Sequence, residues 1–406
     1  MRNNNVIYSF LAIILVFLCG FCSFFASSSV IIINESVNYA GRFVQNCYAN
    51  NNSEEKRKNE NLTSAEAMAT IEANSGRVLF CKNESKKLPM ASTTKIITAI
   101  VAIENCKDLD KKQFIPKEAV GIEGSSIYLR ANEMLSIREL LYGLMLRSGN
   151  DSAVAIAILI AGSVDNFVKL MNDFCKKLNL NDTNIITVNG LHDDNHYTTA
   201  LDLARVTAYA LANKTFAEIV STKNAIIDDN NAKNGKRYLK NKNKLLWTLD
   251  GSNGVKTGYT KKAGRCFVGS ATRGKMKIVC VVLNCVPMFE DCKSLIEKSF
   301  DEFRMITLFR NGVITEKEIL SSGQKFKLPV FLTEDLCYPL KDSELNYLSA
   351  NIKFKENIEL PLSHSNEIGE IEIMLKNNLI FSQKLYTINA DKTKEKSYFQ
   401  KIIRAF

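Results

Sequence analysis

The sequence predicts an α+β domain followed by a small all-β domain. Hairpin patterns flank a helical middle between residues 62 and 311, which indicates an antiparallel sheet with helices packed against it. Between residues 312 and 389 apolar and polar residues alternate, as in an antiparallel sheet with one face against a core. The chain of 406 residues has the length of two domains, and its 46% hydrophobic and 24% charged residues are typical of a globular protein.

The elements of the α+β domain follow from the spacing of apolar residues. A hairpin is predicted over residues 65–80, because Asn74-Ser75-Gly76 forms a turn between two β-rich runs. Apolar residues at helical spacing predict helices at residues 94–104, 137–146, 152–161 and 201–212. A second pair of strands is expected at residues 264–269 and 276–285, with a turn at residues 272–275 and a helix at residues 292–303 after it.

The second domain and the end of the chain have different patterns. Strands are predicted at residues 325–332, 351–360 and 369–375, where apolar residues face one side and polar residues the other. In the tail, residues 390–406, Phe399, Ile402, Ile403 and Phe406 lie on one helical face, beside a net charge of +3 from five basic and two acidic residues. This amphipathic pattern is typical of a helix that binds a membrane surface, and a helix docked on its own domain is the alternative.

The first 49 residues have the features of a signal peptide or an N-terminal membrane segment. Arg2 precedes an uncharged run from Val6 to Ala26, and three serines follow that run. The run is also long enough to span a bilayer, so the sequence leaves open whether the leader is cleaved. A polar linker over residues 50–61 separates it from the fold. We expect an exported protein at the outer face of the cytoplasmic membrane or in the cell wall.

The expected export of the protein determines how its net charge and its cysteines are interpreted. The formal charge of +10 suits an anionic wall or membrane surface, and nucleic acid is not expected, since the chain lacks an aromatic-basic binding motif. Two of the eleven cysteines lie in the apolar run from Val6 to Ala26, and the other nine have no paired spacing. Several lie in apolar runs, so we expect most of them to be reduced core residues, with a Cys280–Cys285 bridge left open.

Ser92 and Lys95 form the first candidate catalytic pair. Ser92-Thr93-Thr94-Lys95 lies at the start of the helix predicted at residues 94–104, and residues three apart share a helical face. A serine becomes a nucleophile when a neighbouring base takes its proton, and a lysine can serve where burial lowers its pKa. The pair alone is a weak signal, because Ser-x-x-Lys also occurs at residues 53–56 and 322–325.

Two further motifs carry groups that suit a peptide substrate. Ser148-Gly149-Asn150 is predicted in a loop between two helices, where a hydroxyl and an amide can relay a proton and hold a substrate amide. A helix-capping turn is the alternative for this motif. Lys256-Thr257-Gly258 leads toward the strand at residues 264–269. Its glycine permits close approach of a ligand backbone, and Lys256 and Thr257 offer donors to a carboxylate.

The three motifs in this order resemble the signature of penicillin-binding proteins and class A β-lactamases. Their surroundings resemble the low-molecular-mass D-alanyl-D-alanine carboxypeptidases of peptidase family S11, a resemblance that spans about residues 63–303 and extends to the β domain and tail. The segments that carry it are PMASTTKIITA, LMLRSGNDSAVAIA, NKLL, GVKTGYT, IEANSGRVLF, GSSIYL and HYTTALDLA. It implies a β-lactamase/transpeptidase-like fold, in which an antiparallel sheet is combined with a helical subdomain.

The resemblance also implies a reaction and a set of residues. Ser92 would be acylated by the penultimate D-alanine of a peptidoglycan stem pentapeptide as the terminal D-alanine leaves, with Lys95 as the general base. Ser148 and Asn150 would shuttle a proton and bind the peptide. Lys256 and Thr257 would bind the terminal carboxylate, and Gly258 and Tyr259 would belong to the same substrate-binding strand. The backbone N–H groups of Ser92 and Tyr259 would form the oxyanion hole. A β-lactam would trap Ser92.

The sequence departs from the family at one place and leaves two alternatives open. Some family members have an arginine after the last long strand that grips the substrate carboxylate, and residues 287–292 contain none. A serine β-lactamase is the first alternative, although no Glu-x-x-Leu-Asn run occurs between residues 151 and 255. A catalytically silent wall-binding or sensor protein is the second. No cofactor or metal is expected, since His192 and His196 flank Asp-Asp-Asn, which is typical of a polar surface loop.

Overall fold

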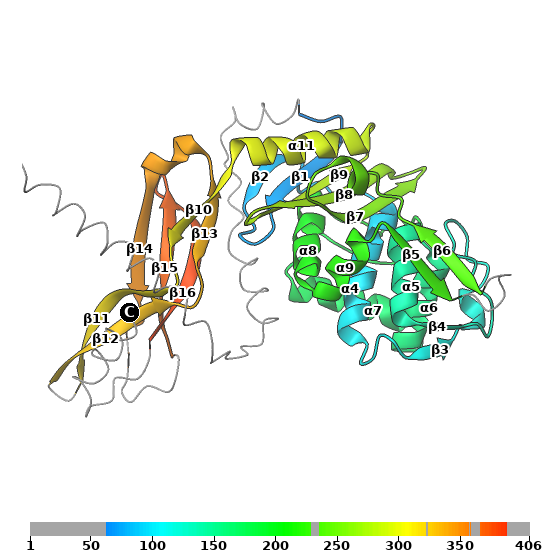
Figure 1. Cartoon of the computed structure of the whole chain (residues 1–406), viewed down its shortest axis with the longest axis horizontal. Helices are drawn as coiled ribbons and strands as arrows, with labels where there is room; N and C mark the ends of the chain where they lie inside the picture. The colour runs from blue at the N-terminus through cyan, green and yellow to red at the C-terminus, as the bar shows by residue number, and fades with distance from the viewer. Residues whose placement is uncertain (1–61, 229–234, 322–323, 357, 359–365, 388–406) are drawn as a thin grey trace, which may run out of the picture.

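A five-stranded antiparallel sheet forms the centre of the first domain. The computed structural model describes residues 62–228, 235–321, 324–356, 358 and 366–387 (Figure 1), so the predicted leader, linker and tail lie outside the described residues. The strand order in the sheet is β2-β1-β9-β8-β7. The strands are β1 (Ala67–Glu72), β2 (Val78–Lys82), β7 (Ser252–Thr260), β8 (Gly264–Arg273) and β9 (Met276–Leu283).

Both faces of this sheet are buried, because alternate residues of its strands enter two different cores. In β9, Val279 and Val281 pack toward the helical subdomain, whereas Ile278 and Cys280 pack toward α11 (Met288–Glu302). Figure 1 shows α11 along one side of the sheet and, on the other, α4 (Lys95–Asn105), α8 (Ala200–Ala212) and α9 (Lys214–Ser221). The predicted hairpins and the antiparallel α+β architecture are therefore confirmed.

The helical subdomain packs against the opposite face of the sheet. Its helices are α4 (Lys95–Asn105), α5 (Ile137–Tyr142), α6 (Asn150–Ala161), α7 (Val164–Lys177), α8 (Ala200–Ala212) and α9 (Lys214–Ser221). A π-helical turn over Gly143–Arg147 follows α5, and α6 is almost wholly apolar and buried over its first two turns. In the described part of the chain no single helix meets the length and hydropathy needed to cross a membrane; α6 and α7 meet them only as a pair bent by 86°.

Two small two-stranded sheets lie at the edge of the helical subdomain (Figure 1). Strand β3 (Lys112–Phe114) pairs with β4 (Met134–Ser136), and β5 (Asn224–Asp228) pairs with β6 (Lys236–Lys240). The short helix α10 (Leu245–Thr248) then leads into β7. The sequence did not predict the β5–β6 hairpin. This hairpin precedes α10 and the strand β7, which carries Lys256.

The C-terminal part of the described chain is all β, as predicted. Strand β10 (Arg304–Phe309) pairs with β13 (Leu336–Leu340), and a five-stranded sheet has the order β11-β12-β16-β15-β14. The strands of that sheet are β11 (Gly312–Ser321), β12 (Gln324–Leu332), β14 (Leu348–Phe354), β15 (Asn366–Leu375) and β16 (Asn378–Thr387). Its core contains Ile371 and Ile373 of β15, which face the same side as predicted.

One arginine connects the central sheet to the β10–β13 strand pair. Arg77, in the turn before β2, lies over the rings of Phe303 and Tyr338 at 5.1 and 5.3 Å from their centroids. Its guanidinium also forms an ion pair with Glu344 and donates a hydrogen bond to the backbone carbonyl of Pro339. The side chain is only 10% exposed, so these contacts are desolvated and hold the first hairpin against the β domain.

Candidate active site

The start of α4 brings Ser92 and Lys95 together. Residues Ala91–Thr94 form a 3-10 turn that continues into α4, and Lys95 is the first residue of the α-helix. The Nζ atom of Lys95 lies 3.0 Å from the Oγ atom of Ser92. Ser92 is partly exposed and Lys95 is fully buried, so the amine lies deeper in the fold than the serine that it contacts.

Lys95 is held by two carbonyl oxygens in addition to the Ser92 hydroxyl. Its Nζ atom donates to Oδ1 of Asn150 at 2.7 Å and to the backbone carbonyl of Asn189. Burial lowers the pKa of Lys95 well below its usual value, and the positive charges of Lys256 and Lys242 lower that pKa further. None of the described carboxylates forms an ion pair with this amine, and a deprotonated Lys95 can accept the proton of Ser92.

The second motif projects from the junction between the π-helical turn and α6. Ser148 has a left-handed backbone with a φ of 65° and is buried, and Asn150 is the first residue of α6 instead of part of the predicted loop. The Asn150 side chain is fixed from both ends: Oδ1 accepts from Lys95 and Nδ2 donates to the carbonyl of Glu123 at 2.6 Å. The structure therefore brings Ser92, Lys95 and Asn150 into one hydrogen-bonded group.

The third motif lies inside β7, at the edge of the central sheet. Gly258 is the residue that allows β7 to approach Ser92, since a Cβ there would lie 3.2 Å from the backbone nitrogen of Ser92 and 3.1 Å from the carbonyl of Met90. Alternation along β7 buries Lys256, with 2% of its surface exposed, and leaves Tyr259 at 63% exposure. Burial lowers the pKa of Lys256 to about 7, and the charge of Lys242 adds to that shift.

Sequence reasoning missed the contact of His196 with the turn that carries Ser92. The predicted polar surface loop is wrong for this residue, which is only 2% exposed. Its Nδ1 atom accepts hydrogen bonds from the backbone N–H groups of Ile186 and Thr187, so the ring proton lies on Nε2 and points to Oγ1 of Thr94 at 2.8 Å. Thr94 in turn donates to the carbonyl of Ala91. Burial lowers the pKa of His196 to about 4, so the ring is neutral at pH 7.

Asp151 is a second residue that the motifs did not identify. It follows Asn150 directly and is fully buried. Its carboxylate accepts hydrogen bonds from the hydroxyl of Ser126 and from the backbone N–H groups of Ile127, Leu129 and Ser152. The carboxylate therefore holds residues 126–129 beside the N-terminus of α6. The sequence signal that could have identified Asp151 is its position in LMLRSGNDSAVAIA, one of the segments that carry the family resemblance.

The described side chains form no group suited to a metal ion. Within residues 62–387, apart from the gaps that the structure leaves undescribed, no cluster of three or more histidine, cysteine or acidic side chains could hold a metal ion.

The eight described cysteines are all free, which confirms the prediction of reduced cysteines for this part of the chain and rules out a Cys280–Cys285 bridge.

An antiparallel sheet flanked by a helical subdomain, with a serine and a buried lysine at the start of one helix, defines the β-lactamase/transpeptidase class of acyl-transferring serine enzymes. The family model for D-alanyl-D-alanine carboxypeptidases, Peptidase_S11, matches residues 53–286, and the model for the C-terminal domain of penicillin-binding protein 5 matches residues 303–393. The chain belongs to peptidase family S11, as the sequence resemblance implied, and is a serine-type D-alanyl-D-alanine carboxypeptidase.

Curated relatives and solved structures agree with this assignment. The chain is 31% identical to the D-alanyl-D-alanine carboxypeptidase DacF of Bacillus subtilis over 78% of this chain and 83% of that protein. It is 29% identical to DacC of Escherichia coli over 83% of this chain and 86% of that protein. Penicillin-binding protein 5 of Haemophilus influenzae superposes with a TM-score of 0.70 at 27% identity, over 80% of this chain and 97% of the other. The Streptomyces K15 DD-transpeptidase gives a TM-score of 0.56 at 31% identity, over 59% and 98%.

Proposed function

We propose that Ser92 is the nucleophile with which the enzyme removes the terminal D-alanine from peptidoglycan stem pentapeptides. The observation that carries this proposal is the contact of 3.0 Å between Ser92 Oγ and the buried Lys95 Nζ. A neutral lysine has two N–H groups and one lone pair. The carbonyl oxygens of Asn150 and Asn189 accept the two N–H groups, so the lone pair faces the hydroxyl of Ser92.

The reaction proceeds in two steps. In the first, Ser92 Oγ attacks the carbonyl carbon of the penultimate D-alanine while Lys95 takes its proton, and the peptide bond to the terminal D-alanine breaks as the leaving nitrogen is protonated through Ser148. In the second, water attacks the resulting ester, and the proton returns to Ser92. The backbone N–H groups of Ser92 and Tyr259 stabilise the oxyanion in both steps.

Substrate binding involves the second and third motifs. We assign Lys256 and Thr257 to the terminal carboxylate of the peptide and the Asn150 amide to its backbone. The close approach of Gly258 to Ser92 supports this assignment, because it places β7 as one wall of the site. A β-lactam carries a carboxylate and a strained amide in a similar arrangement, so it acylates Ser92 and remains attached.

Labelling with a fluorescent penicillin tests the nucleophile. The wild-type enzyme should carry one covalent label, Ser92→Ala should carry none, and Ser85→Ala, at an exposed serine near the turn after β2, should label like the wild type. A label that persists on Ser92→Ala would refute the assignment. Release of D-alanine from a pentapeptide then separates a carboxypeptidase from a β-lactamase, which would instead turn the penicillin over.

The place of action is part of the same proposal. The relatives are D-alanyl-D-alanine carboxypeptidases, and we propose that this chain is exported to the cell wall and that the tail at residues 390–406 binds the membrane surface. The support is the apolar face and the net charge of +3 in that tail. Flotation of the full chain with anionic vesicles, compared with a chain ending at residue 387, measures this binding directly.

A further inference from the structure

The residue before the nucleophile has a strained backbone. Ala91 has a φ of 47°, in the left-handed region that residues with a side chain seldom adopt, and it begins the 3-10 turn that carries Ser92. The turn is enclosed on two sides. A Cβ at Gly258 would lie 3.2 Å from the Cβ of Ala91, and a Cβ at Gly190 would collide with the carbonyl of Ala91. A strained conformation persists only where neighbouring contacts hold it.

Thr94 and His196 hold the carbonyl of this strained residue. The Oγ1 atom of Thr94 donates to the carbonyl of Ala91 at 2.7 Å and accepts from Nε2 of His196 at 2.8 Å. Both side chains are buried, so water does not compete for these hydrogen bonds. A hydroxyl that accepts from one group and donates to another is fixed in its rotation. The imidazole therefore acts on Ala91 through Thr94.

The carbonyl of Ala91 belongs to the same peptide group as the backbone N–H of Ser92. Because this trans peptide is planar, the two groups point in opposite directions, and an orientation imposed on one is imposed on the other. The N–H of Ser92 is one of the two that we assign to the oxyanion hole. Such a donor stabilises the developing charge best when it is aimed before the reaction begins. The chain of hydrogen bonds from His196 to Ala91 thus acts on the direction of this donor.

His196 also closes a loop that contacts Lys95. Its Nδ1 atom accepts from two backbone N–H groups at the start of the loop 186–196, at 3.0 and 3.3 Å, so the ring joins the two ends of the loop. Within this loop the backbone carbonyl of Asn189 accepts from Nζ of Lys95. The loop also packs against the nucleophile turn at Gly190. One buried ring therefore connects the loop beside the base to the turn that carries the nucleophile.

We propose that His196 is a positioning residue for acylation: through Thr94 it holds the carbonyl of Ala91 and so aims the backbone N–H of the next residue at the oxyanion. This inference rests on the proposed function, which assigns the nucleophile and the oxyanion hole. The ring is neutral at pH 7, so it contributes hydrogen bonds and no charge. The role requires a side chain that accepts on one side and donates on the other, and the primary amide of glutamine also meets this requirement.

Acylation kinetics with fluorescent penicillin test the proposal. Labelling over a range of concentrations separates the dissociation constant of the first complex from the rate constant of acylation. Thr94→Val removes the hydroxyl at constant shape and should lower the rate constant about 10- to 100-fold, with a dissociation constant within about threefold of the wild type. His196→Leu should give a similar loss, and the double variant should be no slower than the slower single variant. Thr94→Ser and His196→Gln restore the donors and should each retain at least about a third of the wild-type rate constant.

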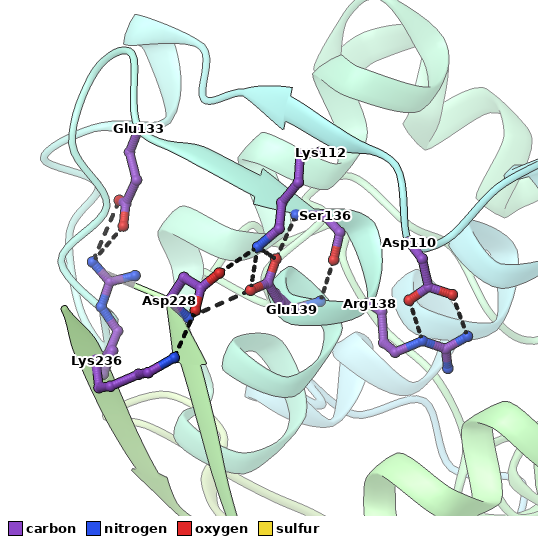
Figure 2. Close-up of polar contacts among 9 residues, drawn as sticks. Asp110, Lys112, Glu133, Ser136, Arg138, Glu139, Asp228 and Lys236 are labelled. Atoms are coloured by element: carbon purple, nitrogen blue, oxygen red, sulfur yellow. Dashed lines mark hydrogen bonds and ion pairs between the residues drawn. The ribbon is translucent and has the colours of Figure 1, made fainter. Parts of the chain in front are cut away.

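Two controls separate positioning from a general loss of stability. Thr207→Val removes a buried hydroxyl that bonds within its own helix, α8, and Arg138→Gln breaks the surface ion pair with Asp110 at 2.7 Å (Figure 2). Both controls should label at the wild-type rate. An unchanged rate constant in Thr94→Val, or the same loss in Thr94→Ser, would overturn the proposal. Failure of the wild type to label at Ser92 would instead overturn the proposed function.

Discussion

Replacement of the buried carboxylate of Asp151 by an amide should destabilise the catalytic domain by about 3 kcal/mol. In Asp151, Oδ2 accepts from Ser126, Ile127 and Leu129, and Oδ1 accepts from the backbone N–H of Ser152 at 2.8 Å. Asp151→Asn keeps the shape but has only one oxygen, so its NH₂ group must face at least one N–H donor. A lost hydrogen bond to a charged group costs about 1.5–3 kcal/mol, and the buried donor left without a partner costs about 1–3 kcal/mol.

Thermal unfolding measures this effect. A loss of about 3 kcal/mol should lower the Tm by roughly 6–12 °C in a domain of about 150–250 residues. Asp250→Asn is the matched control, because the Asp250 side chain is 91% exposed and its ion pair to Arg273 is loose at 3.8 Å. If Asp151→Asn melts within about 1 °C of the wild type and of this control, the carboxylate does not hold residues 126–129 in place, and the reasoning is refuted.

Two other perturbations test the support of the nucleophile and the buried lysine of β7. Gly190 has a φ of 82°, and a Cβ there would collide with the backbone carbonyl of Ala91, next to Ser92. Gly190→Ala should therefore slow acylation of Ser92 by fluorescent penicillin at least about tenfold. An unchanged acylation rate would contradict this reasoning. For Lys256, burial lowers the pKa to about 7, below its value in the unfolded chain, so the unfolded state binds more protons between pH 7 and pH 10. The free energy of unfolding should therefore rise with pH over that range, and urea titrations of Lys256→Met should show a smaller rise than the wild type.

Local patterns in the sequence were enough to predict much of the fold. The turn at residues 74–76, the helix after Ser92 and the alternation in β15 each depend on neighbours a few residues away, and the structure contains all three. The Ser92–Lys95 contact belongs to the same category, because three-residue spacing places both side chains on one side of the helix start.

The rest of the site depends on contacts between residues far apart in the sequence. Lys95 meets Asn189 across 94 residues, and the hydroxyl of Ser125 meets Lys242 across 117 residues. Periodicity cannot reveal such contacts, because each partner looks like an ordinary polar residue in its own segment. His196 shows the same difficulty: its polar neighbours predict a surface loop, yet the fold turns its ring inward to Thr94.

The free cysteines bear on how the enzyme can be produced. Cys175, Cys266, Cys280 and Cys292 lie in apolar surroundings as thiols, Cys285 contacts the polar side chains of Ser64 and Asp291, and none of the eight described cysteines takes part in a cross-link. Folding of the described domains therefore requires neither an oxidant nor a disulfide isomerase. We therefore expect residues 62–387 to fold in the reducing cytosol of an expression host, and reductants in the purification buffer should not weaken the fold.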